Sequence, residues 1–388
     1  MIMLSRVRLG SLIATIISLS MASLGWTETR LTVPPGFIVE QLNFSVPDAR
    51  QMALSENGML IVGTRRKGRV YAIPNALTAP EPKVITLLKG LQMPSGVAIH
   101  NGDLYIGAVS EIIRVADIDS VATADWVAME IITDDLPDER HHGWKYLKFG
   151  PDDQLYVPVG APCNICLSDD RRFASLLRMN PRSGATEFAA EGLRNTVGFA
   201  WHPTTQDLWV SDNGRDMMGD DVPAEEINII PKGNRETLHF GYPFKHSAPD
   251  EGFLSDPKFG DHEQGKNLKI VPPKVRIKAH SAPLGMTFYS SDHFPPIYTN
   301  SLFVAEHGSW NRSAKVGYQV SRVFVDESGQ TAYEPFITGW LIGEQAWGRP
   351  NDVLVTPEGH LLAADDKAGL IYRVRYAAAP KTAFSRNQ

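Results

Sequence analysis

The sequence predicts an all-β protein, a six-bladed β-propeller. The first observation is a pattern that occurs six times: an apolar strand, a turn rich in Gly, Asn or Asp, and a second apolar strand. The second is composition, because Gly and Pro make up about 15% of the 388 residues, which favours short strands and turns. The third is that no stretch of convincing length follows the helical period. An irregular two-sheet sandwich, the alternative, has no reason to repeat one hairpin six times.

Each hairpin has the local chemistry that its strands and turn require. The turns carry residues that tolerate positive φ or preset a turn, and the flanks are β-branched or aromatic. The expected hairpins span Met52–Val62, Val97–Ile106, Tyr146–Val157, Phe199–Val210, Met286–Val304 and Val353–Ala363. A leucine in each second strand gives spacings of 44, 51, 53, 94 and 59 residues, which are typical of propeller blades. We expect the 94-residue interval to hold one blade plus a long insertion.

The N-terminus has the order of a secretory signal peptide. Arg6 and Arg8 supply a basic start, and Leu9–Trp26 carries no charge and ends among small residues. An uncleaved membrane anchor is the alternative, since 18 uncharged residues come close to spanning a bilayer. Five Ser or Thr residues in that run weaken the anchor interpretation. We expect a periplasmic mature chain without stable membrane insertion, with a signal peptide at 1–26, a propeller at 31–376 and a tail at 377–388.

Charge and hydropathy argue against two classes of protein. The net charge is −6, from 38 basic and 44 acidic residues, whereas a nucleic-acid binder needs a basic surface to neutralise phosphates. Mean hydropathy is −0.18, and no uncharged apolar run occurs beyond the extreme N-terminus. The sequence is therefore not that of a polytopic membrane protein.

In a propeller, the innermost strand of every blade starts at one face, around the central channel. The residues just before these strands therefore meet at one mouth, although they are distant in sequence. Blade by blade they are Asp48 and Arg50; Gln92 and Ser95; Arg140, His141 and His142; Arg194 and Asn195; His280–Pro283; and Arg349–Asp352. Arg and His recur in this set, in a chain that is net acidic. The clustering predicts an anionic ligand at the mouth and a histidine able to act as a general base.

Several short motifs then occur in a fixed order. They are His142-Gly143, Leu147–Asp152, Leu193–Asn195, Glu226–Asn228, Phe240–Pro243 and Ala282–Met286. Each motif is weak alone, but the ordered set resembles the glucose/sorbosone dehydrogenase family, quinoproteins that bind pyrroloquinoline quinone (PQQ) on a six-bladed propeller. The resemblance covers roughly residues 31–376. Cys163–Cys166 and Gly308–Arg312 resemble the sorbosone dehydrogenase branch in particular.

The resemblance implies a set of cofactor and catalytic residues. By similarity, His142 takes the hydroxyl proton from the sugar's reducing-end carbon as hydride passes to the quinone, a role that suits an imidazole pKa of about 6.5. Arg194 and Asn195 match residues that face the quinone, where Arg194 would stabilise charge developing on reduction. Arg349 matches an arginine that binds a PQQ carboxylate.

The resemblance also implies calcium. The quinone-site ion is held in this family largely by backbone carbonyls, at positions matching Gly214 and Arg215, with PQQ supplying further ligands. A second, structural calcium corresponds to Glu226 and the carbonyl near Phe240. The acidic run between Asp212 and Glu226 fits calcium, although a solvated loop accounts for it equally well.

Three positions depart from the family pattern. The family's lysine after a blade-five strand falls near Gly308, so His307 or Arg312 would have to replace it as a cofactor ligand. Asn351 stands where the glucose dehydrogenase motif has a second arginine, and His141 stands where an acidic residue precedes the catalytic histidine. These changes leave PQQ binding as the expectation. They bear on its affinity and on the substrate range, so glucose is not carried over as the substrate.

Cys163 and Cys166 are the two cysteines of the chain. A zinc half-site would need a partner pair, and haem attachment would need His directly after the second Cys, where Leu167 stands. Without covalent haem, electrons must leave to an external acceptor such as a cytochrome or a quinone. In an oxidising compartment we expect a local disulfide that braces the loop beside the site.

The sequence thus predicts a PQQ- and calcium-dependent dehydrogenase of an aldose or a sorbosone-like sugar aldehyde. One alternative is a calcium-dependent lactonase, which would want several carboxylate and Asn ligands around the axis rather than Arg and His. Another is a non-catalytic propeller that binds a sugar or a partner protein. A nicotinamide enzyme is set aside, because no Gly-x-Gly-x-x-Gly joins a strand to a helix.

Overall fold

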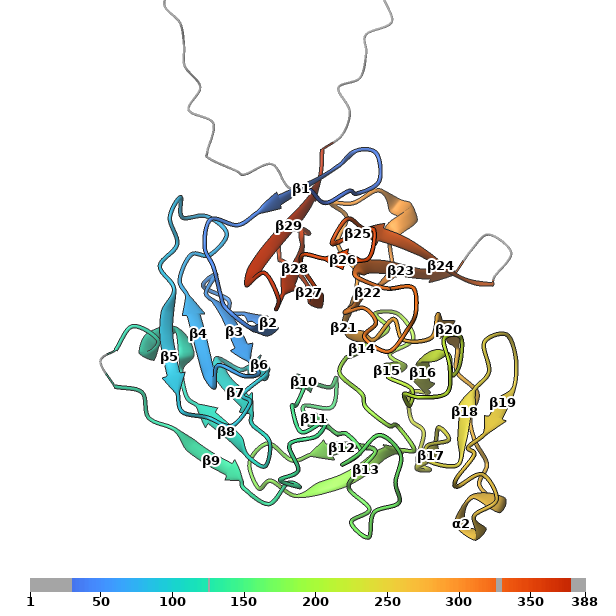
Figure 1. Cartoon of the computed structure of the whole chain (residues 1–388). Coiled ribbons are helices and arrows are strands. Elements are labelled where there is room, and N and C mark those ends of the chain that lie inside the picture. The colour runs from blue at the N-terminus through green and yellow to red at the C-terminus, as the bar shows by residue number, and fades with distance from the viewer. Residues whose placement is uncertain (1–29, 125, 326–329, 378–388) are drawn as a thin grey trace, which may run out of the picture.

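The computed structural model describes residues 30–124, 126–325 and 330–377. The predicted signal peptide at 1–26 lies outside the described residues, as does all but the first residue of the predicted tail at 377–388. The described ranges form six antiparallel blades in a ring around a central axis, which confirms the all-β, six-bladed propeller (Figure 1). Helices in these ranges are single turns, and none is long and apolar enough to cross a membrane.

The blades follow one another along the chain, each running from the axis outward. Blade 1 holds β2 (Ala49–Leu54), β3 (Leu60–Thr64), β4 (Arg69–Ile73) and β5 (Ile85–Lys89). Blade 2 holds β6 (Gly96–His100), β7 (Asp103–Gly107), β8 (Ile112–Val115) and β9 (Glu130–Thr133), with α1 (Ile118–Val121) between its last two strands. Blade 3 holds β10 (Lys148–Phe149), β11 (Leu155–Val159), β12 (Ser175–Met179) and β13 (Thr186–Glu191).

The second half repeats this plan with additions. Blade 4 holds β14 (Phe199–Trp201), β15 (Leu208–Asp212), β16 (Glu225–Ile230) and β20 (Val275–Ile277). Blade 5 holds β21 (Pro283–Phe288), β22 (Leu302–Glu306), β23 (Gln319–Val325) and β24 (Thr331–Ile337), with the 3-10 turn η1 (Pro296–Tyr298). A hairpin of β25 (Leu341–Ile342) and β26 (Gln345–Ala346) precedes blade 6, which holds β27 (Pro350–Val355), β28 (Leu361–Asp365) and β29 (Leu370–Tyr376).

All six hairpins expected from the sequence are present as the two inner strands of a blade. The long interval holds one blade plus an insertion, as expected. The insertion contains β17 (Leu238–His239), β18 (Lys245–Ser247), β19 (Phe253–Ser255) and α2 (Glu263–Lys266). Its β17 pairs in parallel with β13, so the insertion leaves blade 4 and extends blade 3.

The N-terminal strand closes the ring. β1 (Phe37–Gln41) pairs antiparallel with β29 and becomes the outer strand of blade 6. Where blades meet near the axis, glycine is needed for space: a Cβ on Gly198, before β14, would lie 2.0 Å from the carbonyl oxygen of Leu284 in blade 5.

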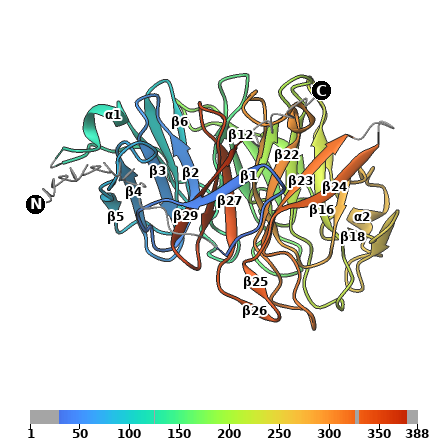
Figure 2. The same cartoon turned by 90° about the horizontal axis from the view of Figure 1, so that it is seen from above.

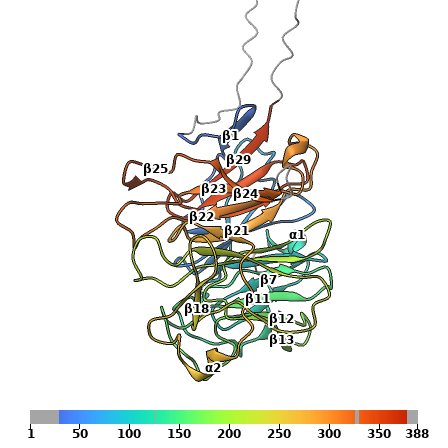
Figure 3. The ribbon, with the colours of Figure 1, turned by 90° about the vertical axis from the view of Figure 1, so that its right-hand side faces the viewer.

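Strand direction defines two faces of the ring. The first strand of each blade starts at the mouth and the second returns to it, so the turn between them lies at the opposite face. Edge-on views show the β25–β26 hairpin projecting from one face and α1 standing at the other (Figures 2 and 3). Since Glu344 and Gln345 line the mouth cavity described below, the hairpin marks the mouth face.

Candidate active site at the propeller mouth

The backbone that enters the inner strands is strained at the mouth. Asp48, Met93, His142 and Ala282 have φ of 64°, 49°, 53° and 56°, just before the first strands of blades 1, 2, 3 and 5. Non-glycine residues adopt this left-handed region at an energetic cost, and such residues cluster at functional sites. Left-handed residues also occur in turns of the opposite face, at Asn101, Asp153 and Gln206, so the chemistry of the mouth rests on its side chains.

His142 is buried and held in one orientation. Its Nδ1 lies 2.9 Å from the carbonyl oxygen of Ala161, which can only accept a hydrogen bond, so Nδ1 carries the proton and Nε2 keeps its lone pair. Burial first, then the positive charge of Arg194, lowers the pKa of His142 well below its ordinary value. A Cβ on Gly160 would lie 2.5 Å from the His142 Cβ, so glycine gives the imidazole its place. The result is a neutral imidazole whose Nε2 has no hydrogen-bond partner among the described residues.

Asp212 fixes the neighbouring loop of blade 4. This carboxylate ends β15 and accepts the backbone N–H groups of Arg194 at 2.9 Å and Asn195 at 2.7 Å. Burial raises the pKa of Asp212 to about 7, against the effect of those hydrogen bonds. Asn195 lies beside His142, since its Oδ1 and the His142 Cβ both crowd the same face of Gly160. His142, Arg194 and Asn195 are therefore brought together, as the sequence predicted.

The guanidinium of Arg194 is buried and held by two loops. Nε and Nη2 donate to the backbone and side-chain oxygens of Asn164 at 2.8 and 2.9 Å, and Nη1 donates to the carbonyl of Asn213 at 3.0 Å. Asn164 lies inside the disulfide that joins Cys163 to Cys166, so the expected bridge is present beside the site. Arg194 thus supplies a fixed positive charge whose orientation depends on that loop.

A second group of predicted residues comes from blades 1, 5 and 6. His307 Nε2 lies 2.9 Å from Asp366, and Arg50 donates to the same carboxylate at 2.9 Å. Burial opposes ionisation of Asp366, but the hydrogen bonds and charges of His307 and Arg50 outweigh it and hold its pKa well below the ordinary range. Arg349 donates to the backbone carbonyls of His307 and Gly308, which fixes the start of the loop after β22.

Arg65 and Trp144 connect the two groups. The Arg65 guanidinium lies over the Trp144 ring, 3.8 Å from its centroid, and that ring meets His142 edge-to-face at 5.7 Å. Burial, with the charge of Arg50, lowers the pKa of Arg65 to about 10, and its Nε is buried without a hydrogen-bond partner in the described chain. Arg65 also lines the mouth cavity together with His307 and Arg349, and Trp144 contacts the Arg65 guanidinium.

That cavity measures about 660 Å³ and is rich in cations. Five Lys or Arg side chains line it against three carboxylates: Arg65, Arg66, Lys315, Arg349 and Lys367 against Asp48, Glu344 and Asp366. Since Asp366 is already paired with Arg50 and His307, the lining has positive charge left for an anionic ligand.

Two other predicted cofactor ligands lie elsewhere. Arg312 reaches the loop before β16, where it pairs with Asp221 at 2.8 Å and donates to the carbonyl of Asp220. Asn351 is buried in the channel wall, donates to the Ala49 carbonyl at 2.7 Å and leaves its Oδ1 unpartnered within the described chain. In this structure, Arg312 holds a rim loop and Asn351 joins blades 6 and 1.

Three of the predicted calcium ligands, Gly214, Glu226 and Phe240, line one small cavity beside blade 4. Among the described residues, no hydrogen bond reaches the carbonyl oxygens of Gly214 and Arg215, which follow β15 at the mouth. Glu226 is directly opposite Asp212 in the strand register, and burial, then Asp212, raises its pKa to about 8. Phe240 lines the same small cavity as these two carboxylates. No cluster of three His, Cys, Asp or Glu side chains is arranged for a metal in the described ranges.

Sequence reasoning missed several residues of the site. Arg65, Asn164, Asp216 and Asp366 follow second strands, whereas the mouth was inferred from positions before first strands, and the resemblance added only other positions after second strands, such as Gly214 and His307. Because the two strands are antiparallel, the residues after the second strand return to the same mouth. That signal was available in the hairpin pattern itself.

This chain is a six-bladed propeller whose mouth carries a buried, neutral histidine and excess positive charge. Propellers with such a mouth are suited to binding an anionic cofactor or substrate. More particularly, this chain belongs to the TrAA12-like family, whose sequence profile matches residues 31–377. An uncharacterized protein of Borreliella burgdorferi is 33% identical over 382 residues, covering 94% of this chain and 96% of that protein. A pyrroloquinoline quinone-dependent pyranose dehydrogenase of Coprinopsis cinerea is 29% identical over 153 residues, which are 33% of this chain and 20% of that protein.

Solved structures share the fold. The PQQ domain of Coprinopsis cinerea pyranose dehydrogenase, in its holo form, has a TM-score of 0.73 at 18% identity and covers 89% of this chain and 97% of its own. The calcium structure of the Trichoderma reesei family AA12 enzyme has a TM-score of 0.71 at 18% identity, with the same coverage. The PQQ-bound aldose sugar dehydrogenase of Streptomyces coelicolor has a TM-score of 0.60 at 19% identity, covering 89% and 99%.

Proposed function

We propose that this chain is a PQQ- and calcium-dependent dehydrogenase that oxidises an aldose hemiacetal to a lactone, or a sugar aldehyde such as sorbosone to an acid. The observation that carries the proposal is the buried His142, neutral and fixed with Nε2 free, beside Arg194 and Asn195. The PQQ-dependent name of the Coprinopsis relative supports it. We infer that the reaction takes place in the periplasm. The predicted signal peptide supports this, as does the disulfide, because disulfides persist in oxidising compartments.

The mouth has the positive charge that PQQ binding requires. PQQ carries three carboxylates, and the cationic cavity includes the buried, unpartnered Nε of Arg65. Arg65, Arg349 and His307 would hold it, whereas Arg312 and Asn351 serve the rim loop and the channel wall. When bound, PQQ supplies an o-quinone that accepts the electrons removed from the sugar. The sorbosone dehydrogenase branch and the external acceptor, a cytochrome or a quinone, stay predictions.

The chain also offers oxygen ligands for calcium. The free carbonyls of Gly214 and Arg215 suit a hard cation at the mouth. Like charges directly opposite across two strands destabilise a sheet, so a cation between Asp212 and Glu226, near Phe240, would relieve that pair. This second site would be structural.

In the proposed sugar oxidation, His142, Arg194 and their neighbours have different roles. His142 Nε2 takes the proton of the hydroxyl on the reacting carbon, while its Nδ1–H stays bound to Ala161. Arg194 keeps its charge in a dry, fixed position, where it stabilises negative charge developing beside it. Trp144 and Arg65 wall the imidazole from solvent on the side toward blade 1.

The test is dye reduction by the purified apoprotein across a panel of aldoses and sorbosone, with PQQ and Ca²⁺ each added or withheld. We expect turnover only when both are added. His142→Ala should abolish turnover yet retain quinone absorbance after desalting, since it removes the base and no cation. Wild-type turnover in that variant would remove His142 from the mechanism. Lactone hydrolysis with calcium alone would instead identify a calcium-dependent lactonase. Sugar binding without any turnover would identify a non-catalytic, sugar-binding propeller.

A further inference from the structure

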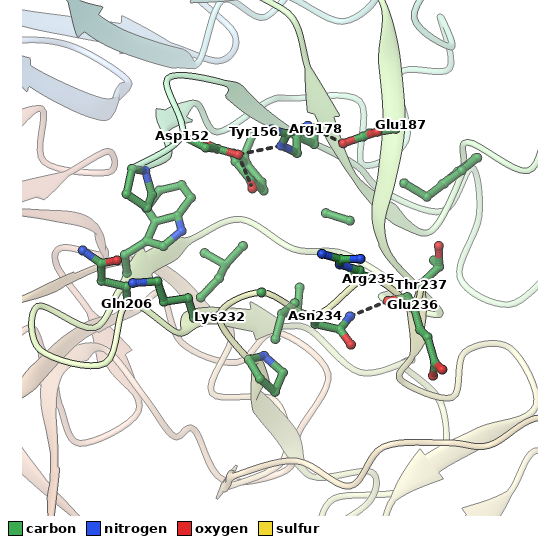
Figure 4. Close-up of a pocket in the computed structure, with 18 of the residues that line it drawn as sticks. Asp152, Tyr156, Arg178, Glu187, Gln206, Lys232, Asn234, Arg235, Glu236 and Thr237 are labelled. Atoms are coloured by element: carbon green, nitrogen blue, oxygen red, sulfur yellow. Dashed lines mark hydrogen bonds and ion pairs between the residues drawn. The ribbon is translucent and has the colours of Figure 1, made fainter.

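A second cavity, of about 780 Å³, lies away from the mouth between blade 3 and the segment Ile230–Thr237 (Figure 4). Asp152 and Gln206 line it from the turns that join the inner strands of blades 3 and 4, and these turns lie on the face opposite the mouth. The segment Ile230–Thr237 crosses from the end of β16 to β17 on blade 3. The groove is therefore built by four separate stretches of chain, outside the site described above.

One wall carries a fixed ionic network. Arg178 on β12 donates from Nε to Asp152 at 2.6 Å and pairs with Glu187 on β13. Tyr156 donates its hydroxyl to the same Asp152 carboxylate at 3.2 Å. These contacts hold planar polar groups, a guanidinium and two carboxylates, in place along the groove (Figure 4).

The opposite wall carries two positively charged side chains that make no polar contact stabilising the described structure. Lys232 and Arg235 are exposed, line the groove, and have side chains without a hydrogen-bond or ion-pair partner in the described part of the chain. Their segment is nevertheless anchored, because the backbone N–H of Lys232 donates to Asp207 at 2.8 Å and the side chain of Asn234 donates to the carbonyl of Glu236. The free side chains are thus presented on a held turn.

The groove also has an aromatic floor. Tyr156 and Trp201 are half-buried, lie edge-to-face with centroids 5.0 Å apart, and pack on the core cluster that contains Leu208 and Ile230. Both aromatic side chains line the groove. The ring faces of Tyr156 and Trp201 form an apolar floor, and the guanidinium and carboxylate groups around them form polar edges.

The charges decide which ligand this surface fits. A polyanion would meet the carboxylates of Asp152, Glu187 and Glu236, and a cation would meet Lys232 and Arg235. A neutral polyhydroxylated ring satisfies both, because its hydroxyls donate to carboxylates and accept from cations while its C–H face stacks on an aromatic ring. We propose that this groove is a second, non-catalytic site for a neutral oligosaccharide. The proposal goes beyond the dehydrogenase reaction and does not depend on it.

The test uses oligosaccharides whose reducing ends have been converted to alditols, so that their ends cannot serve as hemiacetal substrates. Binding of reduced cello-, malto-, xylo- and mannotetraose to the apoprotein, without PQQ or calcium, is measured by calorimetry. We expect at least one to bind with a Kd of about 1 mM or tighter. Arg235→Ala should weaken that binding about tenfold, the effect of one hydrogen bond to a charged group.

Arg235→Ala is the safe variant for folding, because the side chain is exposed and unpartnered. Trp201→Leu tests the floor, with its melting temperature recorded, and should weaken binding by a similar factor. Lys269→Ala, an exposed lysine of the same insertion outside the groove, is the control and should bind as wild type. The proposal fails if none of the four alditols binds, if only a sulfated or phosphorylated glycan binds, or if both groove variants bind like the control. Dye reduction, measured separately, tests the dehydrogenase.

Discussion

At the scale of single residues, His142 shows how local structure sets a chemical role. A left-handed backbone turns it toward β11, the Ala161 carbonyl selects its tautomer, and burial keeps it neutral. A nearby carboxylate would instead favour the imidazolium, but the position before His142 is occupied by His141, whose ring packs on it at 4.1 Å. His141 thus works with burial to keep His142 neutral, which the proposed role as a base requires.

The lowered pKa of His142 predicts a pH profile. A free histidine, with a pKa of about 6.5, is half protonated at that pH and loses basic catalysis below it. Because burial and Arg194 lower the pKa here, the imidazole stays neutral through that pH and is protonated only in more acidic solution. We expect kcat/KM for an aldose to stay level from about pH 8 to pH 6.5 and to fall below that range. An acid limb centred at or above pH 6.5, measured with two different dyes, would contradict the role given to His142.

At the scale of elements, the loop from β11 to β12 links a covalent bridge to the fixed cation of the site. Asn164 inside the bridge accepts two hydrogen bonds from Arg194 and one, at 2.8 Å, from the backbone of Asp216. The next turn of the loop is also held, because the Cys166 N–H donates to the Tyr242 hydroxyl of the insertion at 3.0 Å. The loop thus joins blade 3, blade 4 and the insertion around Arg194.

Removing the bridge should therefore affect both stability and turnover. In Cys163→Ser/Cys166→Ser we expect the free energy of unfolding to fall by about 2 kcal/mol, the chain-entropy value for so short a loop. We expect kcat to fall about tenfold, because the charge of Arg194 is no longer held in place. Denaturant titration and dye reduction measure the two effects.

Asn164→Ala is the matched variant, since it keeps the bridge but removes the side-chain contacts to Arg194 and Asp216. It should lower kcat with a smaller loss of stability. Two free thiols in the native protein would show that the bridge does not form. Wild-type kcat in the double serine variant would show that the bridge has no bracing role.

The elements also show what the sequence could and could not predict. The inner hairpins were predictable because their alternation and turns are local, and Leu60 and Leu361 mark the same register in blades 1 and 6. The position of His142 beside Asn195 followed from the shared start of inner strands. The link from Arg65 through Trp144 to His142 did not follow, because it depends on side-chain directions across two loops. The use of Arg349 to hold the His307 loop likewise depends on distance, which spacing does not give.

At the scale of the whole molecule, one strand pairing closes the ring. β1 reaches β29 across more than three hundred residues of sequence, and the pairing places Phe37 in an aromatic cluster with Phe294 and Phe336 of blade 5. Each blade otherwise contacts its neighbours around the ring, so the closing strand ties the first described segment to the last. The mouth depends on this closure, because Arg50 of blade 1 pairs with Asp366 of blade 6.

Glu40 on β1 forms the ion pairs that join β1 to β29. Its carboxylate accepts from Arg373 at 2.9 Å and from Arg375 at 3.0 Å, and its side chain is only 9% exposed. Removing one member of a buried ionic group leaves its partners poorly solvated, so Glu40→Ala should lower the free energy of unfolding by about 2 to 3 kcal/mol. Glu81→Ala, an exposed glutamate without an ionic partner in the described chain, should change stability by less than about 0.5 kcal/mol.

The number of unfolding transitions shows whether β1 stabilises the whole ring or only blade 6. If β1 holds the ring as a unit, Glu40→Ala lowers the midpoint for both tryptophan fluorescence and circular dichroism, and the two curves still coincide. The proposed cofactor PQQ should then dissociate at the same midpoint, because the mouth joins blades 1 and 6 through Arg50 and Asp366. The opposite outcome is that blade 6 unfolds first, so that the two probes give separate transitions and PQQ stays bound after the first transition. That outcome would show that β1 anchors one blade only.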